Sequence, residues 1–285
     1  MKKIVLISGC SSGIGKSLAE MMANEGHTVF AGARKLSDLK DMADNIIPVQ
    51  LDVNNESDID QVMAIIKKRC GHLDILVNNA GYGAMGPLAE VPASQVQAQF
   101  STNVFAPLLM AQKALPLLRE KSAGKEKLTK NNGLIVNIGS SAGIFTVPFS
   151  GVYGASKAAI HAISEVLRME LAPFNVHVMN VYPGGVASKF GDTAAKKLKD
   201  TLIANSLYKP ALPAIEKRAR ISSNSPTTPD IFSKKLMAAM LDRHPPSDIR
   251  IGHGSSLMNI AKRILPTKLR ELLMRKAYLL NALSS

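Results

Sequence analysis

Short, continuous apolar runs alternate along the chain with longer stretches in which apolar residues recur every three or four positions. Continuous apolar runs are typical of strands buried on both faces of a parallel sheet, and the longer spacing is typical of amphipathic helices. The pattern predicts helices at residues 16–24, 56–68, 94–118 and 156–171, with Pro107 and Pro116 kinking or interrupting the third. It predicts strands at residues 3–8, 27–33, 47–51, 73–77, 134–138, 176–182 and 248–252.

Because strands and helices alternate, we expect an α/β fold in which right-handed crossovers place helices on both faces of the sheet. The prediction is a single doubly wound Rossmann domain at residues 1–252, with a mostly parallel seven-stranded sheet and extra C-terminal helices. Residues 119–132 are polar and Lys-rich, and we expect them to form an exposed loop. Residues 189–247 are rich in Lys, Ala and Pro and carry no motif. The run of Lys196, Lys197 and Lys199 there is either a solvated helix face or an attraction site for an anionic headgroup.

The last segment, residues 253–285, is predicted to be a basic amphipathic helical tail with helices at 257–265 and 267–283. The tail is either a helix that lies on a membrane surface or a helix packed on the core or on a partner subunit. The helix at 156–171 is apolar around much of its circumference, which favours a homodimer. Apolar tail residues at helical spacing are Leu269, Leu272, Leu273, Ala277 and Leu280.

Composition narrows the classes of partner. The chain has 285 residues, is 46% hydrophobic and 20% charged, and carries a formal net charge of +13, which is ordinary for a globular protein except in its basicity. A basic balance fits nucleic acid, an anionic membrane surface or an anionic substrate. Because Trp is absent and aromatic residues make up 5%, the stacking groups expected of a nucleic-acid binder are scarce, and we expect no nucleic-acid partner.

The cysteines and the N-terminus bear on the compartment. Cys10 and Cys70 have no metal-ligand spacing, so we expect a reducing compartment and no metal site. Lys2 and Lys3 followed by an apolar run and Cys10 imitate a lipoprotein signal. However, the run Ile4–Ile7 is shorter than the roughly 7–15 residues that a signal needs, and a buried first strand explains it better. We expect a cytoplasmic protein, with peripheral membrane association through the tail as the alternative.

A glycine-rich loop, Gly9 to Gly15, follows the first predicted strand and leads into a helix. Its glycines permit a tight turn and a close approach of the backbone to a ligand, and the helix N-terminus offers N–H groups and positive potential to a pyrophosphate. The spacing is G-x-x-x-G-x-G. Between a strand and a helix, this pattern predicts a dinucleotide site.

The turn after the second predicted strand indicates which dinucleotide binds. Folds that prefer NAD place an acid there for the ribose 2′-hydroxyl, but the first acid in this chain is Asp38, and Arg34 and Lys35 occupy the turn. A guanidinium matches a 2′-phosphate through two hydrogen bonds. We therefore predict NADP(H), with Arg34 as the main discriminator and Ser11 as a second contact. The alternative is a solvated basic turn.

Tyr153 and Lys157 are one helical turn apart and share a helix face. A free phenol has a pKa of about 10, and a neighbouring ammonium favours the phenolate, so Lys157 is expected to lower the pKa of Tyr153. The pair can then act as a general acid and base on an alcohol or carbonyl oxygen. Ser140 ends the fifth predicted strand and is expected to hold the same oxygen.

Taken together, these motifs and Asn78-Asn79-Ala80-Gly81 give a chain that resembles the classical short-chain dehydrogenase/reductase family over about residues 2–190. It is most similar to the branch with acyl-dihydroxyacetone-phosphate reductases, 17β-hydroxysteroid dehydrogenases and retinol dehydrogenases. The resemblance implies that residues 189–247 close over the substrate and that Asn103 holds a water linking Lys157 to solvent. The alternative for Asn103 is a side chain satisfied by backbone groups. The catalytic set that it implies is Asn103, Ser140, Tyr153 and Lys157.

The resemblance also implies the cofactor contacts. Asp52 would lie against the adenine, or alternatively cap the helix at 56–68, and Asn78 would mainly stabilise the sheet. Ser8 and Ser188 stand where the family usually has Thr, and each keeps the hydroxyl. The predicted cofactor-binding residues are Gly9, Ser11, Ser12, Gly13, Ile14, Gly15, Arg34, Asp52, Val53, Asn78, Ala80, Gly81, Tyr153, Lys157, Pro183, Gly184, Val186 and Ser188.

The function expected from this reading is an NADP(H)-dependent oxidoreductase that interconverts a carbonyl and an alcohol on an apolar lipid-, steroid- or retinoid-like substrate. Two alternatives remain open at this point. One is an NADPH-binding regulator with little turnover, and the other is a membrane-surface lipid-binding protein in which chemistry is secondary.

Overall fold

The computed structural model describes residues 1–120, 133–188, 190–201, 205–223 and 225–283. Most of the loop expected at 119–132 lies outside the described residues, as do the side chains of Lys197 and Lys199. Lys196 is exposed on its helix, which both interpretations of the lysine run allow.

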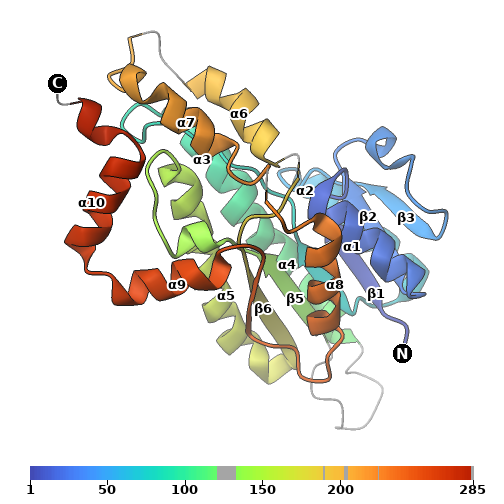
Figure 1. Cartoon of the computed structure of the whole chain (residues 1–285). Helices are drawn as coiled ribbons and strands as arrows, with labels where there is room; N and C mark the ends of the chain where they lie inside the picture. The colour runs from blue at the N-terminus through green and yellow to red at the C-terminus, as the bar shows by residue number, and fades with distance from the viewer. Residues whose placement is uncertain (121–132, 189, 202–204, 224, 284–285) are drawn as a thin grey trace.

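A seven-stranded sheet with the order β3-β2-β1-β4-β5-β6-β7 forms the centre of the molecule (Figure 1). Each pair of neighbouring strands runs parallel, so the predicted doubly wound α/β fold is confirmed. The carboxyl ends of the strands therefore meet at one edge, where such folds bind ligands. The strands are β1 Ile4–Ser8, β2 Thr28–Ala33, β3 Ile46–Gln50, β4 Ile75–Asn78, β5 Gly133–Ile138, β6 Val176–Pro183 and β7 Asp248–Ile251.

Helices cover both faces of the sheet because alternate strand residues point to opposite sides. On one face, α1 (Gly13–Asn24) and α8 (Pro229–Met240) share a buried apolar cluster with the sheet. On the other face, α2 (Glu56–Cys70), α4 (Ala106–Glu120) and α5 (Gly151–Leu171) form a second cluster with the sheet. This double cover explains why the strands are nearly continuous apolar runs.

Three helices begin or break at places other than those predicted. Helix α1 begins at Gly13, and α5 begins at Gly151, so Tyr153 lies inside a helix that was expected to start at Ser156. The long helix predicted at 94–118 is divided into α3 (Ala93–Phe100), a π-helical turn at Ser101–Phe105, and α4. The break thus falls just before Pro107, whereas Pro116 is accommodated inside α4.

The motif-free segment at 189–247 folds over the carboxyl edge of the sheet. It contains α6 (Phe190–Thr201) and α7 (Leu212–Ala219), which precede α8. A third apolar cluster joins α6 and α7 to Phe149 and Tyr153 of the sheet domain. Near the end of the described tail, Tyr278, Leu280 and Leu283 pack against the same cluster.

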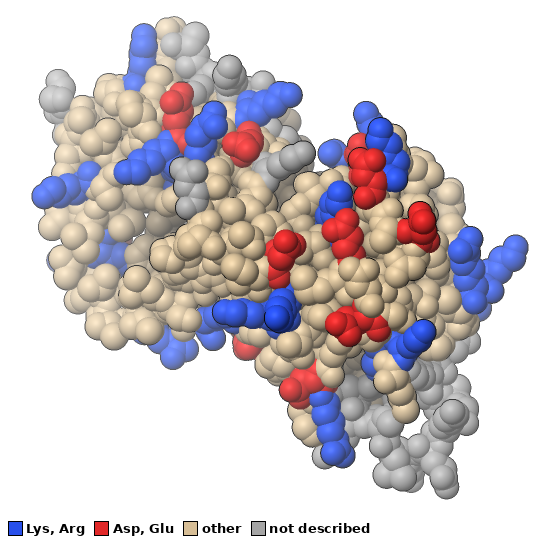
Figure 2. Space-filling view, turned by 45° about the vertical axis from the view of Figure 1, so that its right-hand side comes forward, with Lys and Arg blue, Asp and Glu red and all other residues tan. Residues whose placement is uncertain are grey.

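The tail forms α9 (Ser255–Ile264) and α10 (Thr267–Ala277), which extend along one side of the molecule before the chain returns toward α7 (Figure 1). The end of the tail packs on the core, as one of the two tail alternatives expects, whereas α9 exposes Leu257 by 69% and Ile264 by 72%. Within the described residues, none of the helices combines the length and hydropathy that a membrane span requires. On the face in Figure 2, Lys and Arg side chains are interspersed with Asp and Glu.

Candidate active site

A cavity of about 480 Å³ opens at the carboxyl edge of the sheet. Its walls come from the glycine loop after β1, the ends of β2, β4, β5 and β6, the start of α5, and helices α6 and α7, which lie over the sheet edge and are called the lid from here on. Most of the predicted site residues line it, namely Gly9, Ser11, Ser12, Gly13, Ile14, Arg34, Asp52, Val53, Ala80, Gly81, Ser140, Tyr153, Lys157, Pro183, Gly184, Val186 and Ser188.

The glycine loop is shaped by close backbone contacts. Gly9 has a φ of +74°, and a Cβ there would lie 2.9 Å from the Cα of Ala80, so only glycine fits. The Ser8 hydroxyl accepts hydrogen bonds from the backbone N–H groups of Asn79 and Ala80, each at 3.1 Å. These bonds tie the end of β1 to the loop after β4, which explains how the serine replaces the usual threonine.

The loop and its surroundings fit a dinucleotide phosphate. The first turn of α1 provides backbone N–H groups at the cavity, and a Cβ on Gly13 would lie 3.4 Å from the Cβ of Ser188 on the opposite wall. Arg34, exposed at the end of β2, supplies a cation at that end of the cavity. Backbone donors and a guanidinium are the donor set that a pyrophosphate and a 2′-phosphate require.

Asp52 lies on the cavity wall and does not cap α2. Its Oδ1 accepts a hydrogen bond from the N–H of Asn54 at 3.0 Å, whereas the Asn55 side chain caps the helix by accepting from the N–H of Ser57. The cap alternative for Asp52 is therefore wrong, because Asn55 directly precedes the first turn and reaches its N–H groups.

Tyr153, Ser140 and Lys157 converge on the inner part of the cavity. Tyr153 and Lys157 lie one turn apart on α5, and the Lys157 Nζ is 6.0 Å from the centre of the Tyr153 ring. The same Nζ donates a 2.6 Å hydrogen bond to the carbonyl oxygen of Ile138, at the end of β5. Ser140 follows two residues later, and its hydroxyl interacts with the Tyr153 phenol.

The protonation states of these groups are set mainly by burial. Burial raises the pKa of Tyr153, and this outweighs a hydrogen bond with Ser140 and the positive charge of Arg218, which both lower it. The prediction that Lys157 holds this pKa below its ordinary value is thus wrong for this structure, since desolvation wins. Burial also lowers the pKa of Lys157 to about 8. The pair therefore consists of a protonated phenol and an amine that exchanges protons near neutral pH.

Asn103 lies one layer behind the cavity wall, in the π-helical turn. Its side chain is satisfied by protein groups, because Nδ2 donates to the carbonyl of Tyr82 at 3.0 Å and to Ser156 Oγ at 3.1 Å. A Cβ on Gly81 would lie 3.1 Å from Asn103 Oδ1 and 3.7 Å from Lys157 Nζ, so both side chains approach the same glycine. π-helical turns often occur at functional sites.

Two other predicted cofactor residues also lie outside the cavity lining. Gly15 is buried in α1, where a Cβ would collide with the carbonyl oxygen of Gly9, so this glycine shapes the loop from behind. Asn78 is buried in the sheet and donates hydrogen bonds to the Pro107 carbonyl at 3.1 Å and to Asn137 Oδ1 at 2.8 Å. This agrees with the structural role expected for Asn78.

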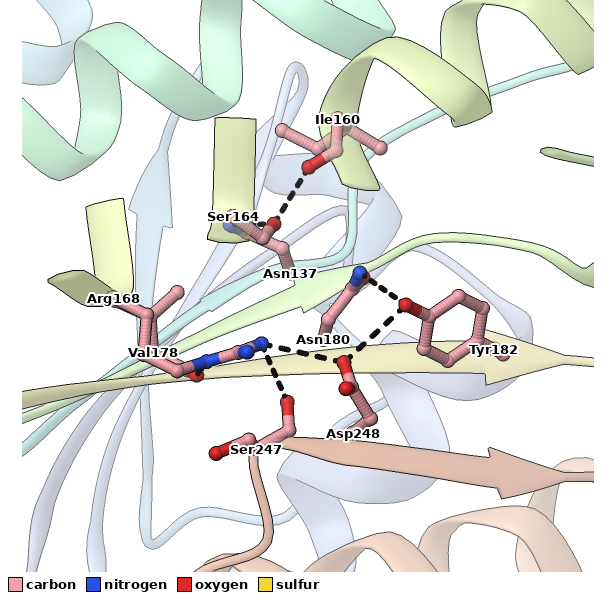
Figure 3. A network of polar contacts seen from close by, with 9 residues as sticks. All are labelled: Asn137, Ile160, Ser164, Arg168, Val178, Asn180, Tyr182, Ser247 and Asp248. Carbon is pink, nitrogen blue, oxygen red and sulfur yellow. Dashed lines mark hydrogen bonds and ion pairs between the residues drawn. The ribbon is translucent and has the colours of Figure 1, made fainter. Parts of the chain in front are cut away.

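A polar network fixes α5 to the sheet beneath the site (Figure 3). Asn137 Nδ2 donates a 2.9 Å hydrogen bond to Ser164 Oγ on α5. Arg168, further along α5, donates to the carbonyl oxygens of Val178 and Ser247, both at 2.9 Å. Because these bonds join α5 to β5, β6 and the segment before β7, they hold the phenol and amine in place over the sheet edge.

Sequence reasoning missed His161, which stands one turn after Lys157 on α5. Its Nε2 accepts a hydrogen bond from the backbone N–H of Ser140 at 3.2 Å. Burial, followed by the charge of Lys157, lowers the pKa of His161 to about 3, so the ring is neutral and able to accept. A Cβ on Gly139 would collide with this ring. The spacing of four from Lys157 was the available signal.

Arg218 was also missed, because it lies in the motif-free segment. It is the next-to-last residue of α7, lines the cavity and is only 8% exposed. The available signal was its place on the apolar face of the helix, three and four residues after Ile215 and Ala214. Phe190 of α6 also enters the site, with its ring centre 5.4 Å from that of Tyr153.

Comparisons with known proteins agree with this geometry. The family model described as short chain dehydrogenase matches residues 3–199. The chain is 32% identical over 292 residues to the NADPH-dependent 1-acyldihydroxyacetone phosphate reductase of Saccharomyces cerevisiae, covering 100% of this chain and 94% of the relative. It is 36% identical over 193 residues to the 3-ketodihydrosphingosine reductase of Bacteroides thetaiotaomicron, covering 67% of this chain and 66% of that protein.

A solved structure is similar over almost the whole length. A short-chain dehydrogenase from Streptomyces avermitilis superposes with a TM-score of 0.78 at 28% identity, covering 97% of this chain and 96% of that one. The likeness therefore includes the lid segments and the C-terminal helices as well as the sheet.

Proposed function

The chain belongs to the short-chain dehydrogenase family, and on this premise we propose that it reduces a carbonyl on an apolar, lipid-like substrate with NADPH. The observation that carries the proposal is the shared cavity: Ser140, Tyr153 and Lys157 line the same space as the glycine loop and Arg34. A reacting carbonyl would be held where the dinucleotide groove meets the phenol.

The roles of the side chains follow from their positions. NADPH, when bound, supplies the hydride. The Tyr153 phenol, which burial keeps protonated, donates its proton to the carbonyl oxygen as the alcohol forms. The Ser140 hydroxyl hydrogen-bonds that oxygen and holds it as negative charge develops. A protonated phenol is the form that reduction needs, which supports reduction as the working direction.

Lys157 and Asn103 complete the proposed set. Because the pKa of Lys157 is about 8, its ammonium can return a proton to Tyr153 near neutral pH. Asn103, held against Tyr82 and Ser156 behind Gly81, is assigned to the path that links this amine to solvent. The predicted cofactor contacts on the cavity wall are assigned to NADP(H), with Arg34 on the 2′-phosphate.

The substrate class has two lines of support. The inner walls of the cavity include Met85, Phe145, Val147 and Phe190, which suit an apolar body. The two relatives named above are reductases of an acyl-bearing ketone phosphate and of a keto-sphingoid base. The names of both relatives support a lipid ketone as the substrate of this chain.

The direct test is the variant Tyr153→Phe, assayed by NADPH oxidation against a panel of lipid, steroid and retinoid ketones. We expect turnover to fall by about a hundredfold or more, because the general acid is lost, while NADPH affinity stays nearly unchanged. Tyr208→Phe, which changes a phenol outside the cavity lining, is the matched control and should retain turnover. Normal turnover in Tyr153→Phe would refute the assignment.

We also propose that α9 makes peripheral contact with an anionic membrane surface. Leu257, Ile260 and Ile264 form an exposed apolar stripe on this helix, with Lys262 and Arg263 in its last turn. An amphipathic helix with an exposed apolar face and basic residues suits the interface of an anionic bilayer. Such contact would bring the cavity near lipid substrates.

A homodimer through the outer face of α5 is proposed as well. Ala155, Ala158, Ala162, Val166 and Met169 recur every three or four residues on this face and are exposed, Val166 by 46% and Met169 by 68%. Small residues in such a stripe permit close helix packing, and the stripe is continuous with the apolar circumference noted in the sequence.

A further inference from the structure

Arg218 is a buried cation that forms no ion pair with a carboxylate in the part of the chain that the structure describes. Its side chain is 8% exposed, and its Nε atom is buried without a hydrogen-bond partner. The described groups whose charge acts on this guanidinium are the phenols of Tyr278 and Tyr153, and none of them is an Asp or Glu. Burial lowers the pKa of this guanidinium, which shows how poorly its charge is solvated.

Packing on the protein alone does not account for this placement. The neighbours of Arg218 on α7 are Ala214, Ile215 and Ala219, which belong to the third apolar cluster. An unpaired charge in such surroundings is strongly unfavourable, and an apolar residue would suit the helix better. A guanidinium held in this position is stabilised when an anion enters the cavity beside it.

The position of Arg218 distinguishes the substrate from the cofactor as the source of that anion. The groups suited to cofactor phosphates lie on the glycine loop and at Arg34, on β1, α1 and β2. Arg218 instead reaches the cavity from the lid, where it acts electrostatically on Tyr153, the group assigned to the reacting oxygen. An anion beside Arg218 would therefore belong to a molecule held between the lid and Tyr153.

We propose that Arg218 binds an oxyanion, a phosphate monoester or a carboxylate, carried by the carbonyl substrate. This inference rests on the proposed reductase function. The planar guanidinium offers paired donors that match either oxyanion. The remaining inner walls are apolar, including Met85, Val147 and Phe190. The cavity thus suits an amphiphile with an apolar body and an anionic head within reach of its ketone.

The test compares Arg218→Leu with wild type on matched pairs of ketones. One pair is a long-chain 2-oxoalkyl phosphate and its dephosphorylated alcohol, and the other is a long-chain keto acid and its methyl ester. Loss of a charge-assisted, bidentate contact should lower kcat/KM on the anionic member about tenfold to hundredfold more than on its neutral partner. The ketone pair with the larger difference between its anionic and neutral members identifies the oxyanion. Arg218→Lys should restore part of the kcat/KM on the anionic member.

Arg220→Leu is the matched control, because Arg220 is an exposed arginine two residues further on that pairs with Asp192. In Arg220→Leu, kcat/KM should change by the same factor on the anionic and the neutral member of each pair. Equal losses on both members of each pair in Arg218→Leu would overturn the proposal, since Arg218 would then act only through Tyr153 or the fold.

A binding measurement keeps the inference separate from the proposed activity. Calorimetric titration of octyl phosphate and octanoate into the protein with NADP⁺ should show binding of at least one anion that Arg218→Leu loses and Arg220→Leu keeps. NADPH affinity, measured by its fluorescence, should be similar in all three proteins. A selective loss of NADPH affinity in Arg218→Leu would assign the guanidinium to the cofactor and overturn the proposal. If no ketone is reduced but the anion binds through Arg218, the reductase assignment fails and the anion site stands.

Discussion

Lys157 and Arg218 are both cations that the fold buries around one phenol, and they differ in what compensates them. Lys157 donates to the Ile138 carbonyl, and its pKa falls to about 8, so it can shed its charge near neutral pH. A guanidinium stays protonated in such surroundings and needs an anion. These two residues thus lower the stability of the fold and serve its function. Replacing such a residue is expected to stabilise the protein and to reduce its activity.

Lys157→Met should stabilise the folded protein at pH 7 while abolishing turnover. The pKa of Lys157 is lowered from 10.5 to about 8, so the unfolded chain binds more protons than the folded one between these values, and stability rises with pH there. The shift corresponds to a penalty of about 3 kcal/mol, full below pH 8 and absent near pH 10.5, at about 1.4 kcal/mol per pKa unit. The lost Ile138 hydrogen bond offsets about 1 kcal/mol of the gain.

The measurement is denaturant unfolding of both proteins from neutral pH to the upper end of that window. The excess stability of Lys157→Met over wild type should shrink as the pH rises and reverse near the upper end of the window, where only the lost Ile138 hydrogen bond remains. Exposed Lys67→Met is the surface control, in which this trend is not expected. A pH-independent difference would contradict the assignment of a buried, charged amine.

Arg34→Ala should shift the cofactor preference from NADPH toward NADH. Removing a charge-assisted contact to the 2′-phosphate is expected to lower kcat/KM for NADPH about tenfold to hundredfold, with little effect on NADH, which lacks that phosphate. Steady-state kinetics with both cofactors measure the ratio. Lys35→Ala is the control, since Lys35 does not line the cavity, and an equal effect of the two variants would count against Arg34 as the discriminator.

At the scale of elements, two helices decide what the site can do. Helix α5 begins at Gly151, two residues before Tyr153, so the phenol and the amine one turn later share a rigid face fixed to the sheet by Asn137 and Arg168. Helix α9 has the opposite character, because at least half of each side chain in its apolar stripe is exposed. The proposed role of α9 therefore depends on whether a membrane surface covers this stripe.

Replacing Leu257, Ile260 and Ile264 together by Ser should weaken binding to phosphatidylglycerol-containing phosphatidylcholine vesicles. Each large apolar side chain contributes about 1.5–3 kcal/mol when buried, so the vesicle affinity should fall by at least about a hundredfold. Co-sedimentation measures it, and turnover of a water-soluble ketone should be kept. Leu207→Ser, an exposed leucine elsewhere, is the control. Binding unchanged by the triple substitution would exclude α9 as the contact.

At the scale of the whole molecule, the site exists only because distant segments meet at one sheet edge. The cavity collects residues from the glycine loop, from α5 and from the lid, and the end of the tail closes it with Tyr278. For this reason, deletion of the tail would disturb the substrate pocket as well as the proposed membrane contact. Point substitutions separate the two roles.

Val166→Glu should convert a dimeric protein into a monomer. The residue lies in the middle of the exposed stripe on α5, where a carboxylate would be buried without a partner in a helix-to-helix interface. Light scattering after size exclusion gives the mass, and Leu241→Glu on another surface is the control. A wild-type protein that is monomeric at micromolar concentration, or a dimer that survives the substitution, would reject this interface.

The sequence by itself determined the features that depend on neighbours along the chain. Apolar runs predicted the strands, the glycine spacing predicted the loop, and the four-residue interval predicted that Tyr153 and Lys157 share a face. Only the tertiary structure decided what burial does, because burial depends on contacts between residues far apart in sequence. It raised the pKa of Tyr153 against expectation and set Asn78 and Asn103 behind the cavity wall. It also placed the His161 ring against the backbone of Ser140 and brought Arg218 into the cavity. The spacing of apolar residues indicates which face of a helix is apolar, but it does not indicate which cavity that face will line in the folded protein.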